Sequence, residues 1–297
     1  MRRRALSIAV LVGLVVAACA SPTPESSTTS ESATSSCVEI QTITSLAKSP
    51  VVGLVALGHS GLTGFKSDPG QPNGDAKENS WATGTNPQVN SVYQRLVAAR
   101  PDTEGHVANR AVDSARAATL IYQAQSARLQ VPTPELVLIQ TIGGDIRCDG
   151  TDDARLVDFG ASLTQALNLF NEASPETRIL IVSHLDRPAT LAEAVSGNES
   201  AKSGFIGHGP CDFFDPATGK LNEEHISSLT DIIESYEAVQ IQVCSEVPNC
   251  STDSGAFSTY RLNSEDLVPG DGHLSVIGHA RAAETIWPTV AQLLSLE

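Results

Sequence analysis

Short apolar segments alternate with longer amphipathic segments along most of this chain, and that alternation limits the fold more than any other feature. The apolar segments predict strands at residues 51–57, 106–112, 135–142, 178–183 and 239–243. The longer segments predict helices at residues 86–99, 115–129, 152–171, 222–236 and 276–294. Apolar strands separated by helices pair in parallel and are covered on both faces. The chain is therefore predicted to be α/β, a three-layer α/β/α sandwich with a mainly parallel central sheet.

The loops at the carboxyl ends of these strands are where a parallel sheet gathers its reacting groups. We therefore expect chemistry after Leu57, Val112, Ile142 and Val243. The sequence contains no internal repeat and no pair of similar α/β halves, which argues against a two-lobed solute-binding protein. One domain, from residue 37 to residue 297, is expected to contain all of these elements.

The first residues have the pattern of a bacterial export signal. Three arginines at positions 2–4 precede an apolar run over residues 5–18, which is too short to cross a bilayer comfortably. The run ends in Val-Ala-Ala before Cys19, as in a lipobox, so residues 1–18 are predicted to be a signal peptide and Cys19 a lipidated N-terminus. Ordinary secretory cleavage and an uncleaved anchor are the alternatives. The protein is expected on the extracellular face of the cell membrane, anchored to it by lipid.

Residues 19–36 are predicted to be a tether. Serine and threonine dominate the segment and no apolar residue cluster interrupts it, so it has nothing with which to build a core. The chain as a whole carries 19 Lys and Arg against 34 Asp and Glu, a formal charge of −15. This charge argues against a nucleic-acid partner, because phosphate binding requires a basic surface.

Disulfides are the expected role of most of the remaining cysteines, because an oxidising compartment preserves them. Cys244 and Cys250 enclose a loop of five residues and are predicted to pair. Cys148 with Cys211 is a weaker preference that leaves Cys37 free, since spacing does not fix the pairing of these three cysteines.

A zinc site is not favoured. His208 lies near Cys211, but the sequence contains no Cys-x-x-Cys spacing. No cofactor is expected.

Two loops near opposite ends of the domain contain the residues of a nucleophilic site. Ser60 lies in a glycine-flanked loop directly after the first predicted strand. Asp271 and His273 lie together on the loop before the last predicted helix. A serine hydroxyl needs a neighbouring imidazole to accept its proton, and the imidazole needs an acceptor on its other nitrogen. The two loops together therefore predict a catalytic triad.

These two loops resemble the first and last blocks of the SGNH (GDSL-like) hydrolase family. The matching residues are 57–60 with 63–64, and 271–275 with 278–280, and the resemblance extends over residues 51–287. The α/β-hydrolase elbow is a different arrangement, and its Gly-x-Ser-x-Gly pattern does not occur here. The resemblance implies a flavodoxin-like fold and ester hydrolysis through an acyl-enzyme. It implies Ser60 as nucleophile, His273 as general base and then general acid, and Asp271 as the group that orients the imidazole.

The middle blocks of the family supply an oxyanion hole, and the resemblance implies the backbone N–H groups of Ser60, Ser114 and Gly144 as its donors. Residues 109–115 are similar to the second block, with Ser114 where glycine is usual. Residues 141–146 take the place of the third block, Gly-x-Asn-Asp, but Gly143, Gly144 and Asp145 include no asparagine. A Gly144→Asn change is expected to raise the rate if the missing amide is what impairs the hole.

Two further departures concern the triad. His59 stands where the family has aspartate, and it either contacts substrate or caps the loop. Asp271 precedes His273 by two residues instead of three, a spacing that an extended loop would allow because alternate side chains then share a face. Asp266 is the fallback partner for His273, and a dyad oriented by a backbone carbonyl is another alternative.

The remaining histidines are assigned less definite roles. His279, in the last predicted helix, is expected to be structural. His184 follows a predicted strand but has no evident partner.

The sequence thus predicts a serine hydrolase that acts on carboxylic esters. Its partners would be small-molecule, lipid or acylated-sugar esters and, through the anchor, a membrane. The alternative is a catalytically impaired domain of the same kind that acts as a ligand- or envelope-binding lipoprotein.

Overall fold

A computed structural model describes residues 50–207 and 209–296 of the chain. Within these residues five strands form one sheet, in the order β2-β1-β3-β4-β5, and every pair of neighbours is parallel. The strands are β1 (Leu54–Gly58), β2 (Val107–Asn109), β3 (Leu136–Gln140), β4 (Arg178–Ile181) and β5 (Cys250–Thr252). The predicted parallel α/β fold is confirmed.

Helices follow most strands and cover the sheet. They are α1 (Val92–Ala99), α2 (Leu120–Gln130), α3 (Asp152–Ala173), α4 (Pro188–Ser196), α5 (Glu199–Lys202), α6 (Glu223–Ser245) and α7 (Val276–Leu293). Short 3₁₀ helices include Ser60–Leu62, Ala117–Thr119, Ser203–Phe205 and Ser264–Asp266.

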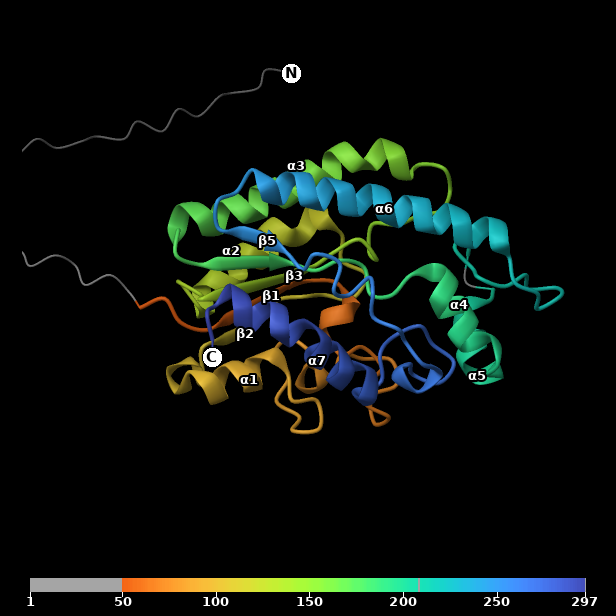
Figure 1. The fold of residues 1–297 in the computed structure, drawn as a ribbon, viewed down its shortest axis with the longest axis horizontal. Coiled ribbons are helices and arrows are strands. Elements are labelled where there is room, and N and C mark those ends of the chain that lie inside the picture. Colours follow the sequence, from red (N-terminus) through yellow and green to blue (C-terminus); the bar gives the residue numbers. More distant parts are fainter. Residues whose placement is uncertain (1–49, 208, 297) are drawn as a thin grey trace, which may run out of the picture. The chain divides into compact units, whose positions relative to one another are not determined.

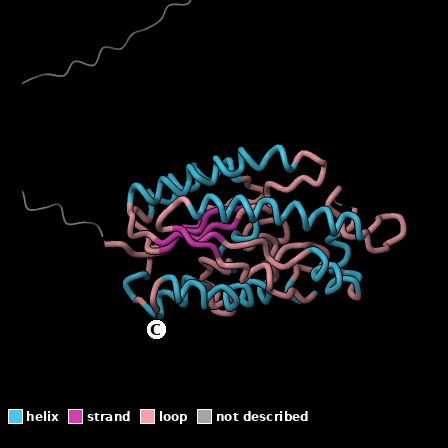
Figure 2. Tube along the Cα trace, turned by 45° about the horizontal axis from the view of Figure 1, so that its top comes forward, coloured by secondary structure: helices cyan, strands magenta, loops and turns pink. Residues whose placement is uncertain are grey.

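The sheet is the middle of three layers (Figures 1 and 2). Helices α2, α3 and α6 pack together on one face, and α1 packs with α7 on the other. Because both faces are covered, all five residues of β1 and all five of β3 are buried, which explains their continuous apolar sequences. The predicted three-layer sandwich is present.

The strand order reverses direction next to β1. The chain passes from β1 to β2 on one side and then crosses to β3 on the other, so the loops after β1 and β3 diverge at their carboxyl ends. Such a reversal leaves a crevice at the edge of the sheet, and ligands of doubly wound folds bind there. The register pairs Gly58 at the end of β1 with Gln140 at the end of β3, so both loops leave the sheet at the same level.

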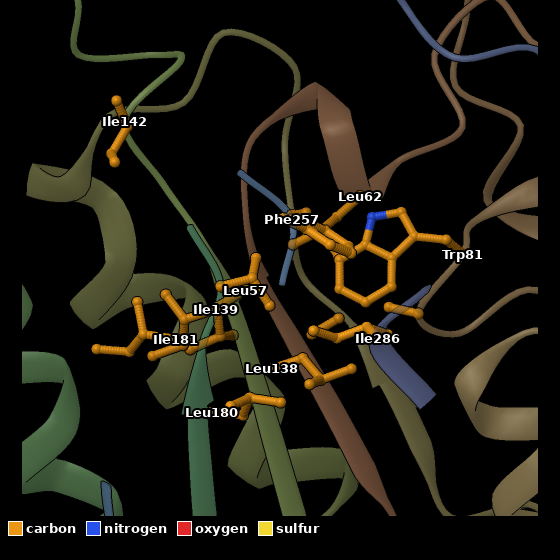
Figure 3. Close-up of a cluster of buried hydrophobic side chains, with 14 of the residues drawn as sticks. Leu57, Leu62, Trp81, Leu138, Ile139, Ile142, Leu180, Ile181, Phe257 and Ile286 are labelled. Atoms are coloured by element: carbon orange, nitrogen blue, oxygen red, sulfur yellow. The ribbon is translucent and has the colours of Figure 1, made fainter. Parts of the chain in front are cut away.

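A cluster of buried hydrophobic side chains includes residues of β1, β3, β4 and α7, together with the rings of Trp81 and Phe257 (Figure 3). Trp81 and Phe257 meet edge to face with their ring centroids 5.0 Å apart, and both are fully buried. The Trp81 indole N–H donates to the carbonyl of Gly61 at 3.0 Å. The apolar core is therefore tied directly to the loop that follows β1.

One predicted strand is wrong. Residues 239–243 continue α6, and the fifth strand is β5 instead. Val239 and Val243 are four residues apart and lie against Gly160 of α3, so their apolar character serves a helix interface. A short alternating segment fits both periods, and here the helical packing decides between them. The carboxyl-end loop on this side of the sheet accordingly follows Thr252 and not Val243.

Two helix predictions need correction. α1 begins after Ser91, which forms a capping box with Gln94, whereas Asn86 makes a turn by accepting from the backbone N–H of Gln88 at 2.9 Å. The segment predicted as one helix from residue 115 contains the 3₁₀ turn Ala117–Thr119 followed by α2. Helices α4 and α5 were not predicted at all.

Both predicted disulfides are present. Cys244 at the end of α6 bonds Cys250 at the start of β5, and Cys148 bonds Cys211 across 63 positions of sequence. Cys19, Cys37, His208 and the predicted signal peptide and tether lie outside the described residues. Among the residues described, no helix combines the length and the apolar character needed to cross a membrane.

Candidate active site

The loop after β1 is held so that Ser60 projects at the carboxyl edge of the sheet. The Gln123 side chain of α2 accepts from the Gly58 N–H at 2.8 Å and donates to the Gly58 carbonyl at 3.0 Å. His59 then caps the 3₁₀ turn at Ser60, because its Nδ1 accepts from the Gly61 N–H at 3.2 Å. Of the two roles considered for His59, the structure shows the loop cap. Ser60 is half-buried at the first position of that turn.

The loop before α7 presents Asp271 and His273 from a tight turn. Val268 donates to the carbonyl of His273 at 2.8 Å, and Asp271 donates to the carbonyl of Val268 at 3.0 Å. The expected extended loop is therefore wrong. The two-residue spacing works because the Oδ1 atom of Asp271 accepts the backbone N–H of His273 at 2.9 Å, which folds the carboxylate back toward the imidazole.

These two loops meet and bring three side chains into line. The Nε2 atom of His273 lies 2.9 Å from the Oγ atom of Ser60, although 213 positions separate the two residues in sequence. On the other side of the ring, Nδ1 forms a short contact with Oδ1 of Asp271. The edge of Phe65 meets the His273 ring, with the centroids 4.9 Å apart. This is the geometry in which an imidazole removes a serine proton while a carboxylate fixes its tautomer.

Asp271 remains ionised in this arrangement. Burial alone would raise the pKa of its carboxyl, but the hydrogen bonds from His273 and from Lys66 outweigh that effect and hold the pKa below its ordinary value. The Lys66 Nζ atom lies 2.6 Å from Oδ2 of Asp271. Sequence reasoning missed Lys66, and nothing in its local sequence relates it to a residue 205 positions away.

The fallback partner, Asp266, is occupied elsewhere. Its carboxylate is fully buried and accepts from the Arg281 guanidinium at 2.8 and 2.7 Å, from the Asn263 N–H at 2.7 Å and from the Tyr260 hydroxyl at 3.2 Å. This cluster ties the 3₁₀ turn Ser264–Asp266 to α7. Asp266 therefore stabilises the loop and does not orient the imidazole.

The loops after β1, β2 and β3, which contain the predicted oxyanion-hole residues, lie side by side. A Cβ placed on Gly144 would lie 1.9 Å from the carbonyl oxygen of Ala115, so the loop after β3 touches the loop after β2, backbone to backbone. A Cβ on Gly143 would lie 3.1 Å from the ring of His59, which places the same loop against the residue before Ser60. Ser60, Ser114 and Gly144 are thus on three adjacent loops.

The backbone N–H groups of these three residues have no acceptor within the described part of the chain. Ser114 has a φ of +58°, in the left-handed region that favours glycine, which gives a physical reason for the glycine usual at this position. The serine adopts that conformation here. The prediction that these N–H groups form an oxyanion hole remains a proposal.

The Gly144→Asn expectation is wrong. A side chain at position 144 would collide with the backbone of Ala115, so an asparagine there would separate the two loops before it could donate. Asp145 does not face the reaction either. Its carboxylate accepts the Ala117 N–H through both oxygens, at 3.2 and 3.0 Å, and burial, partly offset by that bond, raises its pKa.

Three other histidines lie in or near this site. His279 is buried, and its Nδ1 accepts from the backbone N–H of Trp81 at 3.3 Å, which is consistent with the expected structural role. Burial and the proximity of His273 lower its pKa to about 3. His184 lies in the loop after β4, where its backbone N–H donates to Glu237 at 2.9 Å, and burial lowers its pKa. Burial, ahead of the proximity of His184, also lowers the pKa of His59 to about 4.

Two cavities adjoin the site. One, of about 530 Å³, lies beside the loop after β2 and includes Val112, Ala115 and the exposed ring of Tyr122. The other, of about 770 Å³, has Lys66 and Asp271 in its wall. No group of three or more potential metal ligands occurs within residues 50–207 and 209–296.

Solved structures with a similar fold include hydrolases. An extracellular lipase from Streptomyces rimosus is 16% identical, with a TM-score of 0.47 over 82% of this chain and 100% of that one. A phospholipase A1 from Streptomyces albidoflavus is 13% identical, with a TM-score of 0.46 over 82% and 99%. An acetyl xylan esterase is 13% identical, with a TM-score of 0.49 over 80% and 100%. No family model and no curated protein matches the sequence.

Proposed function

We propose that this protein is a serine hydrolase that cleaves carboxylic esters through an acyl-enzyme. The observation that carries the proposal is the 2.9 Å contact between Ser60 Oγ and His273 Nε2, with Asp271 bound to the other ring nitrogen. The arrangement lies at the reversal of strand order, where a substrate has access to it. The His273 side chain is 30% exposed, so the ring can be reached from solvent.

The chemistry follows from these contacts. His273 removes the proton of Ser60 as Oγ attacks the ester carbonyl, and Asp271 stabilises the imidazolium that forms. The imidazolium then donates its proton to the leaving alcohol. Water, deprotonated by His273, then attacks the acyl-serine. The bond between the acyl carbon and Oγ breaks, the acid is released, and the imidazolium returns its proton to Ser60.

The N–H groups of Ser60, Ser114 and Gly144 would stabilise the oxyanion of each tetrahedral intermediate. They belong to adjacent loops and have no acceptor among the described residues, so they are available to a substrate oxygen. Loss of one such donor in a hydrolase costs about 100- to 1000-fold in rate. A side-chain amide is absent from this set, so backbone groups would supply the stabilisation.

A fluorophosphonate probe and a short p-nitrophenyl ester test the proposal together. We expect the wild-type protein to be labelled by the probe and to hydrolyse the ester, and Ser60→Ala to do neither. Ser228→Ala, which removes an exposed serine of α6, should behave as the wild type does. Equal labelling and turnover in the wild type and Ser60→Ala would refute Ser60 as the nucleophile, and absence of both in the wild type would favour the non-catalytic binding role.

We also propose that the enzyme acts outside the cytoplasmic membrane, anchored through lipid on Cys19. The lipobox pattern supports the anchor, and the two disulfides support an oxidising compartment. In a bacterial host, wild-type protein should incorporate radiolabelled palmitate and sediment with membranes. Cys19→Ala should incorporate none, and label retained in that variant would rule the anchor out.

The substrate proposal covers small-molecule, lipid and acylated-sugar esters. A series of p-nitrophenyl esters of increasing chain length would separate these classes, since a cavity of about 530 Å³ beside the loop after β2 sets a limit on what that side accommodates. An optimum at acetate would indicate acylated sugars, and an optimum at long chains would indicate lipids.

A further inference from the structure

The carboxylate of Asp271 is bound on both of its oxygens. Oδ1 accepts the backbone N–H of His273 and contacts the ring Nδ1, while Oδ2 accepts the ammonium of Lys66 at 2.6 Å. The side chains of Asp271 and Lys66 are 17% and 29% exposed. Most of this ion pair is therefore shielded from water, and its charges act on the triad with less screening than a surface pair would.

Lys66 is itself held in place. Its backbone has a φ of +59°, and its N–H donates to the carbonyl of Gly74 at 2.9 Å. Its ammonium lies 5.4 Å from the centre of the Phe65 ring, whose edge meets His273. The dipeptide of Phe65 and Lys66 thus contacts both the imidazole and the carboxylate.

The two-residue spacing between Asp271 and His273 gives the ion pair with Lys66 a role in orienting the carboxylate. Because the turn is closed through Oδ1, rotation of the carboxylate about its last bond would break both the turn and the contact with the ring. Rotation would also break the ion pair between Oδ2 and the Lys66 ammonium, so this ion pair opposes it. We propose that Lys66 is a positioning residue of the triad, which locks the Asp271 carboxylate onto His273 and whose positive charge disfavours the imidazolium form. This inference rests on the proposed hydrolase function.

The other groups that face His273 do not duplicate this charge. His59 and His279 stay neutral, because burial holds their pKa values at about 4 and about 3. On the outer side of the turn, Gly204 packs on the backbone of Asp271, and Phe205 packs on Gly272, and neither carries a charge. Asp271 contributes the negative charge that favours an imidazolium, and Lys66 opposes it.

The pH dependence of kcat/KM in Lys66→Met tests the inference. Loss of the ammonium should move the acidic limb of the profile upward by about one pH unit, since a partly shielded unit charge bound to the carboxylate that contacts the ring has an effect of that order. The plateau kcat should fall by about tenfold because the carboxylate gains freedom. Lys66→Arg should keep the wild-type limb. Lys66→Asn is a second neutral variant, which also tolerates the left-handed backbone.

Lys220→Met is the matched control, because it removes an exposed lysine and changes the net charge equally. An acidic limb that moves no further in Lys66→Met and Lys66→Asn than in this control would overturn the inference. Nitrogen-15 titration of the His273 ring in a Ser60→Ala background gives the same comparison without turnover. Failure of the wild type to hydrolyse any ester would therefore refute the proposed function while this titration still decided the role of Lys66.

Discussion

Gly144 lies against the carbonyl of Ala115 so closely that a Cβ on it would come within 1.9 Å of the oxygen. The contact joins the loop after β3 to the loop after β2, and both loops contribute N–H groups to the proposed oxyanion hole. It also shows why an asparagine has no place at this position. A backbone contact of this kind admits only glycine, whatever a side-chain amide might add.

We expect Gly144→Ala to lower kcat by about 100-fold or more, because the loops must separate and an oxyanion donor moves with them. Gly143→Ala is the matched variant. Its Cβ would lie 3.1 Å from the His59 ring, so a shift of a few tenths of an ångström accommodates it, and the loss should be under about tenfold. Initial rates over a range of p-nitrophenyl acetate concentrations give kcat for both variants. Wild-type turnover in Gly144→Ala would contradict the proposed donor role of this loop.

The two aspartates near α7 should respond differently to amidation. Asp271→Asn is expected to lower kcat by about 10³- to 10⁴-fold with little change in stability, because an amide no longer fixes the imidazole tautomer. Asp266→Asn should keep most of kcat but lower the free energy of unfolding by about 3 kcal/mol, since it breaks the buried pair with Arg281. Steady-state kinetics and urea unfolding separate the two. A larger loss of kcat in Asp266→Asn would reverse the assignment.

Burial of His279 predicts a loss of stability in mild acid. The pKa of His279 is lowered from 6.5 to about 3, so below pH 6.5 the unfolded chain binds a proton that the folded chain does not. The stability that the folded protein retains while His279 is neutral is fully present above pH 6.5 and declines as the pH falls toward 3. Between pH 8 and pH 5 the free energy of unfolding should fall by about 2 kcal/mol from this group.

His279→Asn should remove that part of the pH dependence, because an amide oxygen can still accept the Trp81 N–H. Urea unfolding at pH 8 and pH 5 measures the difference. His106→Asn changes an exposed histidine and serves as the control. Equal pH dependence in His279→Asn and the wild type would show that His279 is not held neutral.

The two disulfides should differ in their contribution to stability. Cys148–Cys211 closes a much longer loop than Cys244–Cys250, with sequence separations of 63 and 6. Loop-closure entropy predicts that loss of the first costs about 4 kcal/mol and loss of the second about 2 kcal/mol. Chemical unfolding of the Cys148→Ser/Cys211→Ser and Cys244→Ser/Cys250→Ser double variants tests the order. A larger loss in the second pair would mean that chain entropy does not control these bonds.

The sequence was most informative where one local pattern had a single structural solution. β1 and β3 are continuous apolar runs bounded by turn residues, and α7 has a serine cap and a clear helical period, so each was predicted close to its true place. The segment 239–243 was ambiguous because its alternation also suits a helix, and only the interface with Gly160 of α3 decides between the two. That interface involves residues far away in sequence.

The same division holds for the site. Ser60, Asp271 and His273 were identified from short motifs, since the chemistry requires those residue types. Lys66 was not, because a lysine in a polar loop has no pattern of its own and its partner is 205 positions away. The turn that closes on Oδ1 was also missed, since an Asp-x-His pair fits both an extended strand and a turn.

The contact between Ser60 and His273 also has a consequence for the timing of biosynthesis. Ser60 is synthesised 213 residues before His273, and His273 lies on the turn just before α7. Until His273 has been synthesised and α7 has packed onto the sheet, Ser60 has no imidazole to activate it. The proposed activity would therefore begin only after the last helix has folded onto the sheet.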